Sequence, residues 1–184
     1  MTDFFHSRLR VTGLAAVAIA TGLAQQASAE AFVDVGINSS RVEADVATLP
    51  ETVTSSSSGL HLGAGARREL TQGSIGARLE LDDVDGELLL AVRALDYRRH
   101  LSERLSLTAF AGAARLDLAT PAYGWYLGGG VELKELWPRW NLTFDIRIGD
   151  KLARDNIASE ETQGDRPDSF YDLRGVAVYL SRRF

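Results

Sequence analysis

The chain has 184 residues, of which 45% are hydrophobic, and it carries 20 basic against 25 acidic side chains and no cysteine. The absence of cysteine excludes disulfides, cysteine-ligated zinc or iron–sulfur sites, a thiol nucleophile and the lipid-modified cysteine of a lipoprotein. The mildly acidic balance disfavours nucleic acid as a partner, and the hydrophobic content is too high for an intrinsically disordered chain.

Residues 1–29 have the pattern of a cleaved export signal. Arg8 and Arg10 precede an apolar run at residues 11–24, and Ala27-Ser28-Ala29 provides the small side chains that a signal peptidase needs. The apolar run, about 14 residues, is shorter than the roughly 20 that a membrane-spanning helix requires. We therefore expect a single domain, residues 30–184, to remain after export.

The rest of the chain alternates between apolar and polar residues with the period of two that is typical of strands. Eight segments show this alternation, in chain order residues 31–38, 60–69, 75–82, 87–98, 104–116, 125–134, 140–149 and 169–184. The phase is clear in most of them but not in residues 87–98 and 104–116. The sequence thus predicts an all-β fold with an even number of strands.

The predicted connections alternate along the chain. Residues 71–73, 99–103 and 135–139 are short and turn-like, and between them come residues 39–58, 82–86, 117–124 and 150–168. We expect the Ser/Thr-rich stretch 39–58 and the charged stretch 150–168 to be long loops at one end of an up-and-down sheet. An eight-stranded antiparallel sheet of this kind hides its edges by closing into a barrel.

Alternation alone leaves two barrels open, a soluble lipocalin-like barrel with an apolar interior and an outer-membrane barrel with an apolar outer face. Three features favour the membrane barrel. The polar face combines glycines with large charged side chains, as expected where space inside a narrow barrel is short. Trp125, Trp140 and Phe184 lie at strand ends on the apolar face, where membrane-interface aromatics belong. Residues 140–149 have about the ten-residue length of a tilted membrane strand. The side chains expected to face lipid include Ala31, Val33, Val35, Ile37, Leu79, Leu81, Leu142, Phe144, Ile146, Val176, Val178 and Leu180.

The C-terminal run Val176-Ala177-Val178-Tyr179-Leu180-Ser181-Arg182-Arg183-Phe184 resembles the last strand of bacterial outer-membrane proteins. In that group the final strand, here with Val178, Leu180 and Phe184, is read by the barrel-assembly machinery. Residues 126–134 and Arg166-Pro167-Asp168 are similar to segments of the small OmpA/OmpX-type barrels. The resemblance implies an eight-stranded transmembrane barrel in the outer membrane of a Gram-negative bacterium, in contact with lipid and lipopolysaccharide. A peptidoglycan-binding domain like that of full-length OmpA is not part of this sequence, so a cell-wall tethering role is not expected.

Seven charged residues fall on the inward face of the predicted barrel: Arg67, Arg78, Glu80, Arg93, Glu132, Asp145 and Arg147. Such a set is compatible with an ion path or a catalytic carboxylate cluster. We instead expect a structural network of ion pairs that fills space. Buried charges must be paired, and a barrel of eight strands is too narrow for a porin-type channel.

Small outer-membrane barrels include lipid A deacylases and palmitoyltransferases, so the histidines are candidates for catalysis. His100-Leu101-Ser102 has a spacing that resembles the His-x-Ser motif of the deacylases, but it lies in a predicted periplasmic turn and the residues after it differ. His61 is expected to donate a hydrogen bond inside the barrel. The acidic residues within 150–168 lack the regular spacing of a calcium loop, which favours a solvated surface over a cation site.

Together these patterns predict a monomeric outer-membrane β-barrel with a structural or surface-interaction role carried by its extracellular loops. We expect no enzymatic activity, no cofactor and no metal site. Two alternatives stay open, a lipid-modifying enzyme of the lipid A deacylase type and a soluble periplasmic barrel that binds a small apolar ligand.

Overall fold

The computed structural model describes residues 29–46, 52–118, 121–154 and 169–184. The predicted signal peptide, up to residue 28, lies outside the described residues and stays a prediction. The described chain forms eight strands: β1 (Ala29–Val46), β2 (Val53–Leu70), β3 (Gly73–Val84), β4 (Glu87–His100), β5 (Leu105–Leu116), β6 (Ala122–Trp137), β7 (Trp140–Arg154) and β8 (Ser169–Arg183). Each predicted strand is present, and most are longer than the alternation indicated. No helix in this part of the chain is long and apolar enough to cross a membrane.

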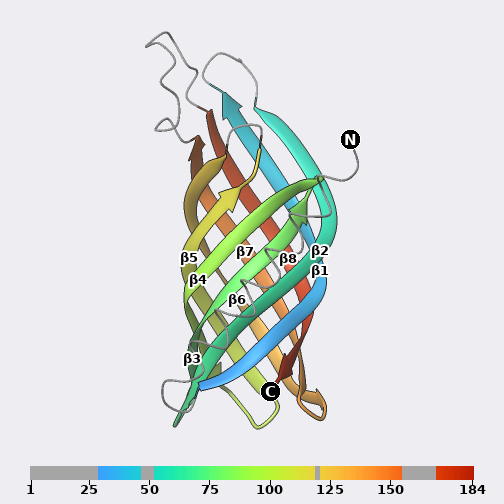
Figure 1. Ribbon diagram of the computed structural model, residues 1–184, viewed down its shortest axis with the longest axis vertical. Helices are drawn as coiled ribbons and strands as arrows, with labels where there is room; N and C mark the ends of the chain where they lie inside the picture. The colour runs from blue at the N-terminus through green and yellow to red at the C-terminus, as the bar shows by residue number, and fades with distance from the viewer. Residues whose placement is uncertain (1–28, 47–51, 119–120, 155–168) are drawn as a thin grey trace, which may run out of the picture.

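The strands close into one barrel (Figure 1). Each strand pairs antiparallel with the next one in the chain, and β8 pairs antiparallel with β1, from Phe32 opposite Arg183 to Val46 opposite Ser169. Closure gives every strand two neighbours, although β2 extends past the last β2–β3 pair, so that its residues 53–60 are paired with β1 alone. The predicted eight-stranded, all-β, up-and-down barrel is confirmed.

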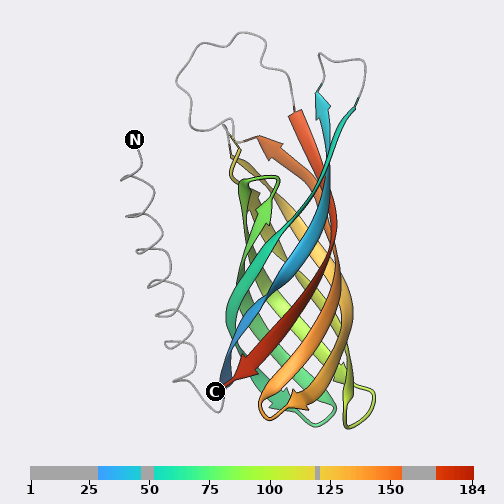
Figure 2. The same cartoon turned by 90° about the vertical axis from the view of Figure 1, so that its right-hand side faces the viewer.

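The barrel has two unlike ends (Figure 2). The C-terminus and the connections after β2, β4 and β6 lie at one end, which we call the turn end. The connections after β1, β3, β5 and β7 lie at the other, which we call the loop end. Residues 47–51, 119–120 and 155–168 of these connections lie outside the described residues.

The prediction of a loop over residues 39–58 is wrong for most of its length. β1 continues to Val46 and β2 starts at Val53, so the Ser/Thr-rich stretch forms a paired hairpin. The same part of β1 also pairs with β8, with Arg41 opposite Arg174. Intrinsic strand preference is weak and depends on context, so backbone hydrogen bonds to a neighbour on each side extend the strand. The predicted loop over residues 150–168 is also shorter than expected at its start, because β7 continues to Arg154.

The connection between β3 and β4 is a tight turn. Asp85 and Gly86 have φ angles of 59° and 82°. Positive φ at both central residues gives the two-residue turn that matches the twist of the flanking strands, and an Asp-Gly pair adopts it readily. The β3–β4 turn therefore lies lower than the tips of β1 and β2, which rise above it (Figure 2).

The phase of β4 changes partway along the strand. The β4–β5 ladder has a register shift between Arg93 and Leu95, and the β3–β4 ladder has one between Gly76 and Arg78. As a result Arg93 and Asp96, three residues apart, are both buried. A strict period of two would place them on opposite faces, which is why the alternation in residues 87–98 has no clear phase.

Candidate functional site

The structure places all seven charged residues of the predicted inward set inside the barrel. None of them exposes more than 4% of its surface. They come from β2, β3, β4, β6 and β7, so side chains from strands far apart in the sequence meet across the interior.

Arg93 links two carboxylates at the centre of this set. Its Nη2 lies 2.7 Å from Oε1 of Glu80 and its Nη1 donates to Oδ2 of Asp145 at 2.8 Å. Its guanidinium carbon lies 3.3 Å from the ring centre of Phe110, within the range of a cation–π contact. Asp145 also accepts a 2.6 Å hydrogen bond from the hydroxyl of Tyr179. A buried arginine is thus paired on both sides, as a charge in low dielectric requires.

Four charged residues that were not in the predicted set complete the network: Asp34, Asp82, Asp96 and Arg98. Arg78 donates to Asp34 at 2.7 Å and to Asp96 at 2.9 Å. The remaining pairs join Arg147 to Asp82 at 2.7 Å, and both Arg67 and Arg98 to Glu132. Asp96 and Arg98 follow the register shift in β4, so their inward position could not be inferred from a constant period.

The buried charges nearly balance. In the part of the chain that the structure describes, five arginines (Arg67, Arg78, Arg93, Arg98 and Arg147) face six carboxylates (Asp34, Glu80, Asp82, Asp96, Glu132 and Asp145). Most of these pairs connect strands that are not neighbours in the sheet, so the network ties opposite walls of the barrel together. The arginines and carboxylates of the network neutralise one another, because each of them lies next to a group of opposite charge.

An apolar cluster lies inside the barrel toward the loop end, where buried polar side chains such as Ser40 and Asp82 are also present. The cluster consists of the buried residues Val84, Leu89, Ala91, Phe110, Ala114, Leu116, Ala122, Tyr126, Leu152 and Leu173. We call this cluster the apolar plug. Most of its members lie at the strand ends that face the loops. An ion crossing the barrel would pass this apolar cluster as well as a network of paired charges, and both oppose its passage.

The outer face of the barrel is apolar. Ile37, Leu60 and Ile146 expose 63%, 65% and 54% of their surface. The twelve side chains predicted to face lipid all lie on the outward side of their strands, next to inward residues that are buried. Val178 and Leu180 of the predicted assembly signal are among them.

Aromatic side chains mark both ends of this apolar face. Trp125 near the loop end is 72% exposed, and Phe184 at the turn end is 63% exposed. Trp140 is partly exposed at the turn end, where the guanidinium of Arg182 lies 5.7 Å from its ring centre and 5.5 Å from that of Phe184. Trp137, which the sequence analysis placed within a turn, is also exposed there because β6 extends to it.

The two histidines of the barrel have different surroundings. His61 is fully buried, and its Nδ1 lies 2.7 Å from Oδ1 of Asp82. His100 at the turn end contacts the hydroxyl of Ser106 through Nδ1 at 3.0 Å and Glu69 through Nε2 at 3.3 Å. The serine of this group is fully buried in the interior, so its hydroxyl has no open side toward a substrate.

Ser102, the serine of the His-x-Ser spacing, is not the partner of His100. Its hydroxyl accepts hydrogen bonds from the backbone amides of Arg104 and Leu105, at 3.4 and 3.1 Å, and so stabilises the β4–β5 turn. The described residues contain no group of three or more histidines or carboxylates placed to hold a metal ion. Most of the acidic stretch 150–168 lies outside them.

Comparison with known proteins identifies structures with a similar fold but assigns the chain to no family. No protein-family model matches the chain, and no curated protein sequence does. Among solved structures it is similar to Ail, the attachment invasion locus protein of Yersinia pestis, alone (TM-score 0.53, 10% identity) and in complex with the heparin analogue sucrose octasulfate (TM-score 0.52, 12% identity). Each alignment covers 85% of this chain and 99% of Ail. It is also similar to Neisserial surface protein A (TM-score 0.50, 11% identity), over 83% of this chain and 97% of that one. Both neighbours are eight-stranded outer-membrane barrels, and at these identities the likeness shows a shared fold.

Proposed function

We propose that the chain is an integral outer-membrane β-barrel of a Gram-negative bacterium, with its turn end in the periplasm and its loop end at the cell surface. The observation that carries this proposal is the polarity of the barrel, whose interior holds five buried arginines and six buried carboxylates and whose outer face is apolar. A lipocalin-like binder needs the reverse arrangement, with an apolar cavity enclosed by the sheet.

The apolar outer face suits a bilayer rather than water. Soluble monomers rarely expose a continuous apolar surface of more than a few hundred Å², whereas this face extends around β1, β2, β6, β7 and β8. Closure also gives every strand a hydrogen-bonded neighbour on each side through the body of the barrel, which is the condition for sheet structure in hydrocarbon. Exposed aromatics at the two ends, such as Trp125 and Phe184, match the interfacial girdles of membrane barrels.

The proposed role is structural and interactive. The ion-pair network and the apolar plug fill the barrel, and the β1–β2 hairpin carries a serine-rich run at the loop end, where Ser55 donates a hydrogen bond to Asp85 of the β3–β4 turn. The β1–β2 hairpin and the connection between β7 and β8, carried on a filled barrel, are the segments that we propose for surface contacts. Lipid, lipopolysaccharide and, during biogenesis, the barrel-assembly machinery are the partners that this proposal implies.

Migration on a gel without boiling tests the membrane barrel. Protein refolded in detergent should give a compact, fast-migrating band that converts to the unfolded position on boiling. A soluble, monomeric, β-rich protein in buffer without detergent would overturn the proposal and direct the search to an apolar ligand.

The absence of cysteine makes the orientation testable in cells. A single cysteine can be introduced at either end of the barrel. Ser56→Cys places it in the hairpin at the loop end, and Gln72→Cys places it in the turn between β2 and β3 at the opposite end. A maleimide that does not cross the outer membrane should label the first variant in intact cells and the second only after permeabilisation. The opposite pattern would reverse the proposed topology.

We propose no enzymatic activity. The group of Ser106, His100 and Glu69 has the residue types of a hydrolase relay, but its serine is buried and lies at the turn end. Mass spectrometry of lipid A from cells with and without the protein is the direct test. A lost or gained acyl chain that depends on His100 would make the chain an enzyme.

A further inference from the structure

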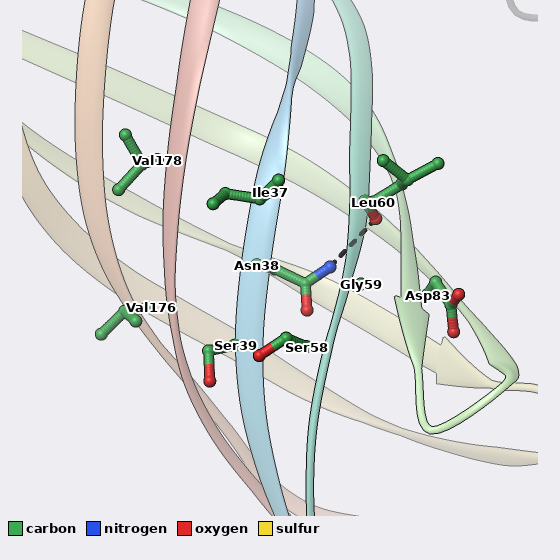
Figure 3. Close-up of a pocket in the computed structure, with 9 residues that line it drawn as sticks. All are labelled: Ile37, Asn38, Ser39, Ser58, Gly59, Leu60, Asp83, Val176 and Val178. Atoms are coloured by element: carbon green, nitrogen blue, oxygen red, sulfur yellow. Dashed lines mark hydrogen bonds between the residues drawn. The ribbon is translucent and has the colours of Figure 1, made fainter.

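A groove of about 410 Å³ opens on the outer face where β1, β2, β3 and β8 meet, toward the loop end (Figure 3). Ile37, Leu60 and Val178 form its apolar part. Ser39 and Ser58 lie one step further toward the loop end, as Figure 3 shows. The groove is therefore mainly apolar, with the two serines on its side toward the loop end.

The groove exists because the barrel wall has a step at this place. His61 opposite Asp82 is the last pair of the β2–β3 ladder toward the loop end, whereas β1 and β2 stay paired as far as Ala44 opposite Val53. Asp83 lies at the edge of the step, next to the β3–β4 turn (Figure 3). A groove of this size falls within the roughly 300 to 1,000 Å³ of small-molecule sites.

Directly beyond the groove, two arginines face each other across strands. Arg41 of β1 is paired with Arg174 of β8, two residues past Ser39 and Val176, which corresponds to about 7 Å along the strands. Both are exposed on the outer face. Like charges directly opposite each other on one face repel, and an anion between them would relieve that repulsion.

Carboxylates form the next row toward the loop end. Glu43 is paired with Asp172, and Glu43 contacts Nε of Arg41 at 3.0 Å. That contact is made at Nε, and the side chain of Arg41 is 58% exposed, so an incoming anion can reach its guanidinium group. Toward the loop end, the outer face thus changes from the apolar groove to the arginine pair and then to the carboxylate pair. Ser39 and Ser58 lie at the groove, and Ser56 lies opposite Arg41.

This order matches the parts of one class of molecule. We propose that the groove and the arginine pair bind a phosphorylated glycolipid of the outer leaflet, and this inference rests on the membrane barrel proposed above. An acyl chain occupies the groove, and a phosphate lies on Arg41 and Arg174, whose planar guanidinium groups suit phosphate oxygens. The carboxylate of Glu43 accepts a hydrogen bond from a sugar hydroxyl.

The arginine row also fits the depth of a phosphate. It lies at the boundary where outward residues change from apolar, at Ile37 and Val178, to charged, at Arg41 and Glu43. Arginine in the hydrocarbon region costs several kcal/mol, about 2 to 4 at the midplane, but little at the interface. The phosphates of outer-leaflet glycolipids lie at the same interface.

The test compares lipids first, so that it does not depend on any variant. Refolded protein in detergent is mixed with bisphosphorylated lipid A or with the same lipid after removal of both phosphates, and retained lipid is measured by native mass spectrometry. We expect the phosphorylated form to bind at least about tenfold more tightly, as charge-assisted hydrogen bonds predict. Equal retention of the two lipids would overturn the inference.

Variants then locate the site. Arg41→Ala combined with Arg174→Ala should reduce binding of the phosphorylated lipid about tenfold or more, and Val176→Phe should weaken binding of both lipids by filling the groove. Arg115→Ala is the matched control, because Arg115 is also a partly exposed arginine near the loop end, on β5, and it pairs with Asp117 at 2.9 Å. The control should bind as the unaltered chain does. An equal loss of lipid binding in the control would show that the phosphorylated lipid is attracted to positive charge in general, and would refute the site.

The compact gel band separates the two possible failures. If the unaltered chain gives no compact band in detergent, the membrane barrel itself is wrong, and the lipid site with it. If the band forms in every variant but retention does not depend on phosphate or on the arginine pair, only the lipid site is wrong.

Discussion

Replacing Arg93 by methionine should destabilise the barrel more than any comparable change on its outer face. Glu80 would keep two cations nearby, Arg78 at 3.6 Å and Arg147 at 3.7 Å. Asp145 would keep only hydroxyl donors in place of its 2.8 Å arginine partner. The substitution therefore leaves one uncompensated carboxylate in the interior.

The expected loss in the free energy of unfolding is about 3 to 5 kcal/mol, the cost of removing one partner from a buried ion pair. Arg99→Met is the control, because Arg99 lies on the exposed face of the same strand, and it should change stability by about 0.5 kcal/mol or less. Adding Asp145→Asn to the Arg93→Met chain removes the orphaned charge and should restore about 2 kcal/mol.

The assay is reversible denaturant unfolding of the refolded protein in lipid vesicles, followed by tryptophan emission and by the compact gel band. A loss below about 1 kcal/mol for Arg93→Met would refute the argument that this charge pair is structurally required. So would a double variant whose loss equals the sum of its two single losses, since coupling between the partners would then be absent.

Four further outcomes follow from the same geometry. Ile146→Arg on the outer face should cost about 2 to 4 kcal/mol and prevent the compact band from forming, whereas Thr143→Ala inside should have a mild effect; the reverse would exchange inside and outside. Gly128→Leu should also abolish the band, because even a Cβ there would lie 2.3 Å from the ring of Phe110. In planar bilayers the protein should show no steady open steps, and a sustained large conductance would contradict the apolar plug. Phe184→Ala should lower the amount of barrel assembled in cells but not refolding in detergent; equal levels in cells would argue against a terminal assembly signal.

Local sequence patterns were sufficient for the strand count and for most inward and outward positions. Residues 140–149, for example, alternate without interruption, and the structure buries Asn141, Thr143 and Asp145 while exposing Phe144 and Ile146. Alternation with period two is a property of neighbouring residues along one strand, so it can be read without knowledge of the fold.

The same local reading failed where the ladder is irregular or where both faces are apolar. The register shift after Arg93 brings Asp96 and Arg98 inside, and nothing in their own sequence marks the shift. Leu89 belongs to the apolar plug although it lies between two other leucines, so no alternation could show which of the three points inward. In both cases the direction of the side chain depends on how the neighbouring strands pair with β4.

By itself, then, the sequence determined an eight-stranded barrel, its strand order and the polarity of most of its wall, because these depend on short-range period and turn chemistry. Only the tertiary structure decided which arginine meets which carboxylate across the interior, since such pairs join residues as distant as Arg67 and Glu132. It also decided that the serine-rich stretch after Asn38 is strand, because β8 and β2 hydrogen-bond to it from both sides. The opposed pair of Arg41 and Arg174 exists for the same reason, as barrel closure is what brings the first strand against the last.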